Sequence, residues 1–171
     1  MINQVIAFDE EEVEADENMG SLNHSLVQGN LTVLLSYDER FTVLPELSLE
    51  TSHIDLSQFS LRTKEELKPD ISVYLDPPES VPVDVLCVQK MPDLSIEILS
   101  PSQGISGLIA KIKAYFALGV KSCWLIIPAT KTIQVYSQPT EGETFDTKDT
   151  EVVDKVMDIK IPVNRVFKRV R

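Results

Sequence analysis

The sequence predicts an α/β fold, in its α+β form, with a mixed β-sheet packed against helices. Two stretches repeat apolar residues every three or four positions, which is typical of amphipathic helices. Several shorter stretches alternate apolar and polar residues, which is typical of half-buried strands. The order along the chain is helix, strands, helix, strand, strand, and such a mixture indicates a sheet covered by helices.

The two predicted helices carry different boundary signals. The first spans residues 20–37 and opens at Gly20-Ser21, where a serine is a favoured N-cap, although Gly29 costs about 1 kcal/mol inside a helix. Its apolar stripe consists of Leu22, Leu26, Val27, Leu31, Leu34 and Leu35. The second helix spans residues 104–118, follows the helical period, and ends at Gly119 in the manner of a C-terminal glycine cap.

Three alternating stretches form the first half of the predicted sheet. Residues 42–50 alternate as one half-buried strand, and Pro45 places that strand at a sheet edge or near its own start. Residues 71–75 and 94–99 alternate in the same way, and a Pro-Asp pair lies before each of them. Between these two strands, residues 83–89 form either a short strand or an extended connection.

The second half of the predicted sheet begins with a different pattern. Residues 122–128 are continuously apolar, which fits a central strand covered on both faces. Residues 132–137 alternate and are expected to pair with this strand as a hairpin. The remainder of the chain is polar and ends with a strand-like stretch over residues 158–163.

We expect one domain over residues 20–171, preceded by an acidic segment over residues 1–19. The net charge is −11, and residues 1–17 hold seven acids and no Lys or Arg. This charge argues against a large, non-specific nucleic-acid-binding surface. From residue 155 onward there are six basic residues and one acid, so a smaller basic surface can still exist on the folded domain.

The chain shows no sign of a membrane association. No apolar run reaches the roughly 18 residues of a membrane span. The first residues also lack the basic and then apolar pattern of a secretory signal. We therefore expect a cytoplasmic protein with no membrane partner.

Two carboxylates stand out because of where they fall in the predicted strands. Asp70 lies at the mouth of one strand, and Glu97 lies inside the next, between Ile96 and Ile98. A carboxylate within an otherwise apolar strand is costly to bury unless a partner compensates its charge. Mg²⁺ favours one or two carboxylates together with waters and phosphate oxygens. Asp70 and Glu97 from neighbouring strands are thus candidate ligands for Mg²⁺ or Mn²⁺.

Two lysines on the second predicted helix could complete this set. Hydrolysis of a phosphodiester needs an activated water and charge neutralisation at phosphorus, and a bound metal supplies both. A lysine beside the metal can orient the water or contact the phosphate. Lys111 and Lys113 flank the apolar stripe at comparable angles, so periodicity does not choose between them. We interpret Tyr115 and Trp124 as core residues.

The sequence resembles the Uma family of putative restriction endonucleases, which is common in cyanobacteria and belongs to the PD-(D/E)XK nuclease superfamily. The resemblance covers about residues 65–137 and, more loosely, residues 20–64. The matching residues are Pro69-Asp70, Glu97 before Leu99-Ser100-Pro101-Ser102, Lys111, Tyr115, Gly119-Val120 and Trp124. The Leu-Ser-Pro-Ser segment followed by the helix is the more specific part, whereas a lone Pro-Asp is weak.

The resemblance implies a restriction-endonuclease-like mixed sheet and a metal-dependent endonuclease that hydrolyses phosphodiester bonds in DNA. It also implies that Asp70 and Glu97 bind the metal and that Lys111 completes the catalytic set. Glu46, on the polar face of the earlier strand, is an accessory acid in this interpretation. His24 falls where the family often carries a histidine on its first helix. Asp93 is interpreted as a strand-entry residue near the site.

Two features depart from the family pattern. The family usually carries an acid near the start of the lysine helix, where this chain has Gly104-Ile105-Ser106-Gly107, and the acidic N-terminal segment is atypical. A second hypothesis is therefore an inactive protein that keeps the nuclease fold as a binding or oligomeric scaffold. A homodimer is expected for an enzyme that cuts two strands.

Overall fold

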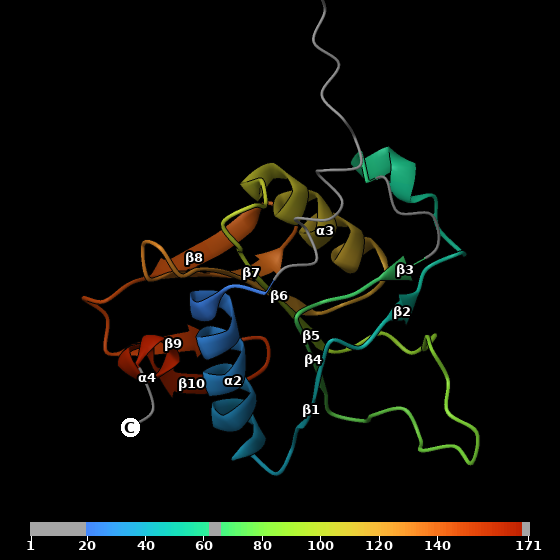
Figure 1. Ribbon diagram of the computed structural model, residues 1–171, viewed down its shortest axis with the longest axis horizontal. Coiled ribbons are helices and arrows are strands. Elements are labelled where there is room, and N and C mark those ends of the chain that lie inside the picture. The colour runs from blue at the N-terminus through green and yellow to red at the C-terminus, as the bar shows by residue number, and fades with distance from the viewer. Residues whose placement is uncertain (1–19, 62–65, 169–171) are drawn as a thin grey trace, which may run out of the picture.

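The computed structural model describes residues 20–61 and 66–168, and its centre is a six-stranded mixed sheet (Figure 1). The strands, in spatial order, are β1 (Thr42–Pro45), β4 (Ile71–Tyr74), β5 (Leu94–Ile98), β6 (Ser122–Ile127), β7 (Thr132–Gln138) and β8 (Glu141–Phe145). Strands β5 and β6 are parallel, and the other neighbours in this sheet are antiparallel. The predicted α+β fold with a mixed sheet is confirmed.

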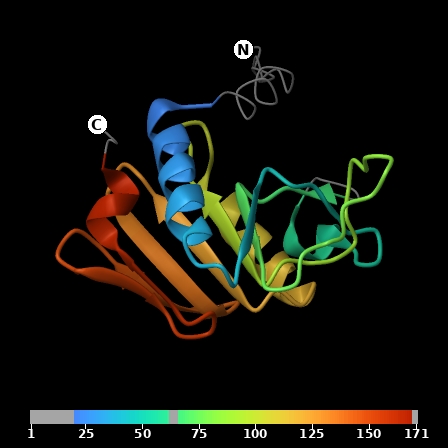
Figure 2. The same cartoon turned by 90° about the horizontal axis from the view of Figure 1, so that it is seen from below.

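Helices and two small two-stranded sheets cover this central sheet. The remaining elements are α2 (Leu22–Ser36), β2 (Leu49–Glu50), the 3₁₀ helix η1 (Leu56–Phe59), β3 (Glu66–Leu67), α3 (Ile105–Ala117), β9 (Glu151–Asp154), β10 (Ile159–Pro162) and α4 (Val163–Phe167). Strand β2 pairs with β3, and β9 pairs with β10. Figure 2 shows α2 lying along one face of the sheet with α4 beside it, and α3 lies on the opposite face.

Each face of the sheet has its own hydrophobic core. Strand residues that point toward α2, α4 and the β9–β10 pair, such as Ile96 and Trp124, are fully buried in one core. Alternate residues, such as Cys123 and Leu125, point into the second core with α3, η1 and β2. Because neighbouring side chains of a strand leave on opposite faces, a strand between two cores must be apolar throughout. The continuously apolar β6 is accordingly a central strand, as predicted.

Helix α2 confirms the first predicted helix and its cap. The Ser21 side chain accepts a hydrogen bond from the backbone N–H of His24 at 3.3 Å, which places serine at the N-cap. Val27, Leu31 and Leu35 are buried. Leu22, which we included in the apolar stripe, is instead 69% exposed, because it precedes the part of the helix that lies on the sheet.

The prediction of one continuous strand over residues 42–50 is wrong. The backbone turns at Glu46, which has a φ of 56°, so this stretch becomes two strands in different sheets. Strand β1 pairs with β4, and β2 pairs with β3. Pro45 does end an edge strand, as predicted. A left-handed residue interrupts the alternation of a strand in a way that hydrophobic pattern alone does not reveal.

The second predicted helix and the hairpin after it are confirmed. Helix α3 ends at Ala117, and Gly119 follows the C-cap with a φ of 96°, the left-handed conformation that glycine adopts without strain. Strands β6 and β7 then pair as the expected hairpin. Residues 83–89 form an extended connection in which only Val88 bridges to Leu49.

The C-terminal part holds more regular structure than the sequence indicated. The predicted strand over residues 158–163 exists as β10, but the preceding polar stretch contains β8 and β9, and α4 follows. Strand β8 is largely exposed, so it lacks the apolar alternation on which the prediction depended. The acidic segment predicted over residues 1–19 lies outside the described residues. None of the described helices is long and apolar enough to cross a membrane.

Candidate active site

The two predicted acids lie together at one end of the central sheet. The antiparallel register of β4 and β5 pairs Ile71 with Ile96. One residue further in the same register, Asp70 lies beside Glu97. The Oδ2 atom of Asp70 accepts a hydrogen bond from the backbone N–H of Ile98 at 2.6 Å. Asp70 is therefore attached to the same stretch of β5 that carries Glu97.

Glu97 is an almost completely buried carboxylate, with 2% of its surface exposed. Its Oε1 accepts a hydrogen bond from the Tyr115 hydroxyl at 2.5 Å, and its Oε2 lies 3.5 Å from the Lys111 ammonium. The pKa of Glu97 is raised to about 7, chiefly by burial and also by the negative charge of Asp70, while Lys111 and Tyr115 oppose the shift. The proton on this acid is thus held until about neutral pH.

The structure distinguishes the two lysines that periodicity left equivalent. Lys111 points toward Glu97 and keeps 27% of its side chain exposed, whereas Lys113 is exposed to solvent on the outer side of α3. Lys111 and Tyr115 are four residues apart, so both side chains leave α3 on one face. Tyr115 is buried, as predicted, but its hydroxyl also belongs to the site. The sequence offered one signal for this role, the four-residue spacing from Lys111.

His24 joins the site from the opposite face of the sheet. Its Nε2 lies 3.0 Å from Oδ1 of Asp70, from a position in the first turn of α2. The hydrogen bond to Asp70 raises the pKa of His24, and the charges of Asp70, Glu46 and Glu97 add to this, against the opposing effect of burial. A protonated His24 therefore compensates part of the negative charge of the two acids.

Glu46 lies at the rim of this site. Its carboxylate is 3.5 Å from Lys68 and accepts a hydrogen bond from Gln28 at 3.3 Å, and its backbone N–H donates to the carbonyl of Asp70. Asp93 lies at the other end of β5, where Lys121 is its ion-pair partner at 2.8 Å. Asp93 is thus removed from the acids, although we expected it near the site.

The donor set at the site fits a small divalent cation. Among the described residues, no three His, Cys, Asp or Glu side chains are grouped so that they could hold a metal ion. The two carboxylates of Asp70 and Glu97 are the hard oxygen donors that Mg²⁺ prefers, with water and phosphate completing its shell. Both carboxylates already have partners in the protein, so a cation either shares their oxygens with these partners or displaces Lys111 from Glu97 or His24 from Asp70.

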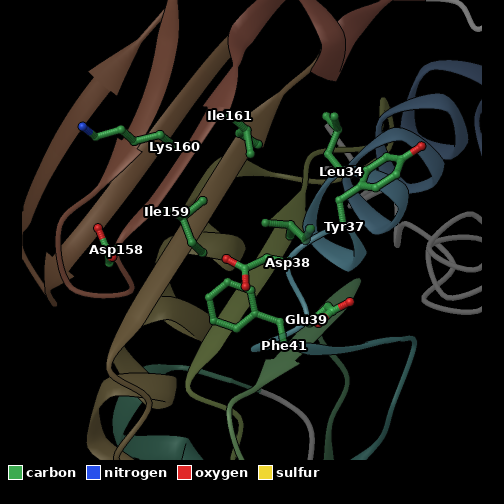
Figure 3. A pocket seen from close by; sticks show the side chains of 10 residues that line it. Leu34, Tyr37, Asp38, Glu39, Phe41, Asp158, Ile159, Lys160 and Ile161 are labelled. Atoms are coloured by element: carbon green, nitrogen blue, oxygen red, sulfur yellow. The ribbon is translucent and has the colours of Figure 1, made fainter.

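A hollow of about 720 Å³ lies elsewhere, where the C-terminal end of α2 meets β10 (Figure 3). Its lining combines apolar and acidic side chains. The ten lining residues are Leu34, Leu35, Tyr37, Asp38, Glu39, Phe41, Asp158, Ile159, Lys160 and Ile161. Arg40 pairs with both Asp38 and Asp158 at its edge. None of the predicted site residues lines this hollow, so we do not assign chemistry to it.

Comparison with known proteins agrees with the fold. The chain is similar to a putative nuclease belonging to DUF820 from Anabaena variabilis ATCC 29413, with a TM-score of 0.69 and 25% identity over 87% of this chain and 82% of that one. The mixed sheet and this likeness thus define a protein of the nuclease-fold class. Residues 4–163 match the family Uma2, described as putative restriction endonuclease, and the chain belongs to that family. No curated protein matches it.

Proposed function

We propose that this protein is a Mg²⁺-dependent endonuclease that hydrolyses phosphodiester bonds in DNA. The observation that carries the proposal is the meeting of Asp70, Glu97 and Lys111 at one sheet end, with Glu97 buried and Lys111 3.5 Å from its carboxylate. Membership of a family described as putative restriction endonuclease supports the substrate class.

The residues of the site have separate roles in this proposal. Asp70 and Glu97 would hold the cation, which supplies a nucleophilic water and charge neutralisation at phosphorus when bound. Lys111 is partly exposed, so its ammonium can orient the water or contact a phosphate oxygen. His24 holds Asp70 in place through Oδ1, while the backbone of Ile98 holds Oδ2.

The test is cleavage of plasmid and single-stranded DNA with Mg²⁺ or Mn²⁺. Lys111→Ala should lower the rate by roughly 10²- to 10⁴-fold, the usual contribution of a group that assists proton transfer. Lys113→Ala is the matched control, because Lys113 lies on the same helix but faces solvent. Equal rates for the two variants would remove Lys111 from the mechanism.

We also propose that the active form is a homodimer, because a two-fold assembly presents two sites to two antiparallel strands. Sedimentation should then show a dimer, and linear product should accumulate without a long-lived nicked circle. A monomer that only nicks supercoiled DNA would contradict this proposal.

One observation favours a second candidate function, that of a binding or oligomeric scaffold without catalysis. Both acids already have partners in the protein: Asp70 has His24 and the backbone N–H of Ile98, and Glu97 has Tyr115 and Lys111. A site that is complete without a cation could serve as a stable structural element. Absence of Mn²⁺ binding in calorimetry at millimolar concentrations, with the protein folded, would favour the scaffold.

A further inference from the structure

The buried tyrosine of α3 has an unusual partner for its hydroxyl. Tyr115 has no exposed surface, and its hydroxyl donates to Oε1 of Glu97 at 2.5 Å. Tyr74 is equally buried, but its hydroxyl donates to the backbone carbonyl of Lys90 at 2.8 Å. A buried tyrosine hydroxyl needs an acceptor, and a main-chain carbonyl satisfies this need without involving an acid. The choice of Glu97 therefore links Tyr115 to the site.

The two oxygens of Glu97 are held by donors of different mobility. Tyr115 occupies Oε1 from inside the core, where packing fixes its ring. Lys111 reaches Oε2 at 3.5 Å, which is longer than a good hydrogen bond, and part of its side chain is in solvent. The ammonium can leave Oε2, whereas the tyrosine cannot leave Oε1 without a rearrangement of the core.

We infer that Tyr115 is a positioning residue, which holds Oε1 of Glu97 so that Oε2 is the oxygen presented to the cation. The inference rests on the proposed function and assigns separate roles to the two donors from α3. Tyr115 fixes the metal ligand, and Lys111 acts on the water or the phosphate. Hydrogen-bond partners of a ligating carboxylate typically change metal affinity or activity by about 10- to 100-fold when they are removed.

The experiment compares Mn²⁺ binding and DNA cleavage in Tyr115→Phe, Tyr74→Phe and Lys111→Ala. Calorimetry should show Mn²⁺ affinity lowered by about 10- to 100-fold in Tyr115→Phe. Tyr74→Phe is the matched control: it also removes one buried hydroxyl, and it should bind Mn²⁺ as the wild type does. Lys111→Ala should lose cleavage while its Mn²⁺ affinity is equal to or higher than that of the wild type, because no ammonium then competes for Oε2 of Glu97.

The outcomes separate this inference from the proposed function. Wild-type protein that binds no Mn²⁺ overturns the proposed function and the inference with it. Wild-type protein that binds Mn²⁺, together with a folded Tyr115→Phe variant of unchanged affinity, overturns the inference alone. Equal losses of affinity in Tyr115→Phe and Tyr74→Phe also overturn it, because they would reflect a general loosening of the fold. If Tyr115→Phe does not fold, Mn²⁺ affinity is compared in Tyr115→Leu, which adds no metal ligand, and an affinity equal to that of the wild type there overturns the inference.

Discussion

Two buried carboxylates of this protein have contrasting surroundings. Asp154, at the end of β9, is 1% exposed, and it accepts hydrogen bonds from the Ser122 hydroxyl at 2.6 Å, the Trp124 indole at 2.8 Å and two backbone N–H groups at 2.9 and 3.0 Å. Glu97 is equally buried, but its neighbours are a lysine, a tyrosine and a second acid. Neutral donors around Asp154 connect β9 to β6, whereas the neighbours of Glu97 are ionisable and form the proposed site.

The difference lies in what each carboxylate can exchange. Asp154 has donors that belong to the backbone or to fully buried side chains, so its position is part of the core. Glu97 has one partner, Lys111, that is partly in solvent. Because Lys111 can be displaced, Glu97 at the end of the sheet can receive a ligand. Asp154 is enclosed by neutral donors and cannot.

The largest expected effect is the loss of DNA cleavage when Glu97, and not Asp154, is replaced. Glu97→Gln removes the proposed metal ligand and should lower DNA cleavage by about 10³-fold or more, since a metal supplies several kcal/mol of transition-state stabilisation. The variant should remain folded, because the amide fills the same space. Cleavage rates per folded molecule, with folding checked by circular dichroism, measure this effect. Retention of most of the activity would exclude Glu97 as a ligand.

The next largest effect concerns the contribution of Asp154 to the free energy of unfolding. Asp154→Ala leaves a hydroxyl, an indole and two backbone N–H groups without their acceptor, and each unsatisfied buried donor costs about 1–3 kcal/mol. We expect a loss of about 3 kcal/mol or more in the free energy of unfolding, measured by urea denaturation. A loss below about 1 kcal/mol would show that water replaces the carboxylate.

The pH dependence of stability sharpens the comparison further. Glu97 has a pKa of about 7 in the folded protein against 4.5 as its ordinary value, so the folded state binds the proton more tightly. The free energy of unfolding should therefore fall as pH rises from about 4.5 to about 7, by ~3 kcal/mol. Glu97→Gln should lack this decline. A wild-type profile that matches the variant between these two pH values would contradict the raised pKa.

The smallest effect concerns the serines beside the two acids. Ser95 lies two residues before Glu97, and its buried hydroxyl has no hydrogen-bond partner within the described part of the chain, whereas Ser122 donates to Asp154. Ser95→Ala should leave stability unchanged or raise it by about 1 kcal/mol, and Ser122→Ala should lower it by about 1 kcal/mol. Thermal unfolding of the pair checks the sign. Destabilisation of similar size in both would mean that Ser95 has a partner.

The sequence predicted Glu97 but not Asp154 for a physical reason. Glu97 interrupts an apolar strand, so its cost is visible in the local pattern. Asp154 ends a polar stretch that looks solvated, and its side-chain partners, Ser122 and Trp124, are 32 and 30 residues away in the chain. The donors that compensate a buried charge can come from distant parts of the chain, and the local alternation of apolar and polar residues does not reveal them.

Local sequence pattern likewise predicts some of the site residues and not others. Asp70 and Glu97 were predictable, because each lies at a definite place in an alternating strand. Periodicity does not separate Lys111 from Lys113, since the choice depends on the rotation of α3 about its own axis against the sheet, and only the family resemblance selects Lys111. Tyr115 was assigned to the core, which its ring confirms, but the acceptor of its hydroxyl lies on another element.

The antiparallel pair β4–β5 has a consequence for engineering. Asp70 precedes β4 and Glu97 lies near the end of β5, so both acids are at the open end of the pair, and the connection over residues 75–93 closes the other end (Figure 1). Exposed connections of this kind tolerate added sequence. A reporter peptide or an accessory module can therefore be grafted between residues 79 and 86 while the geometry of the acids is preserved.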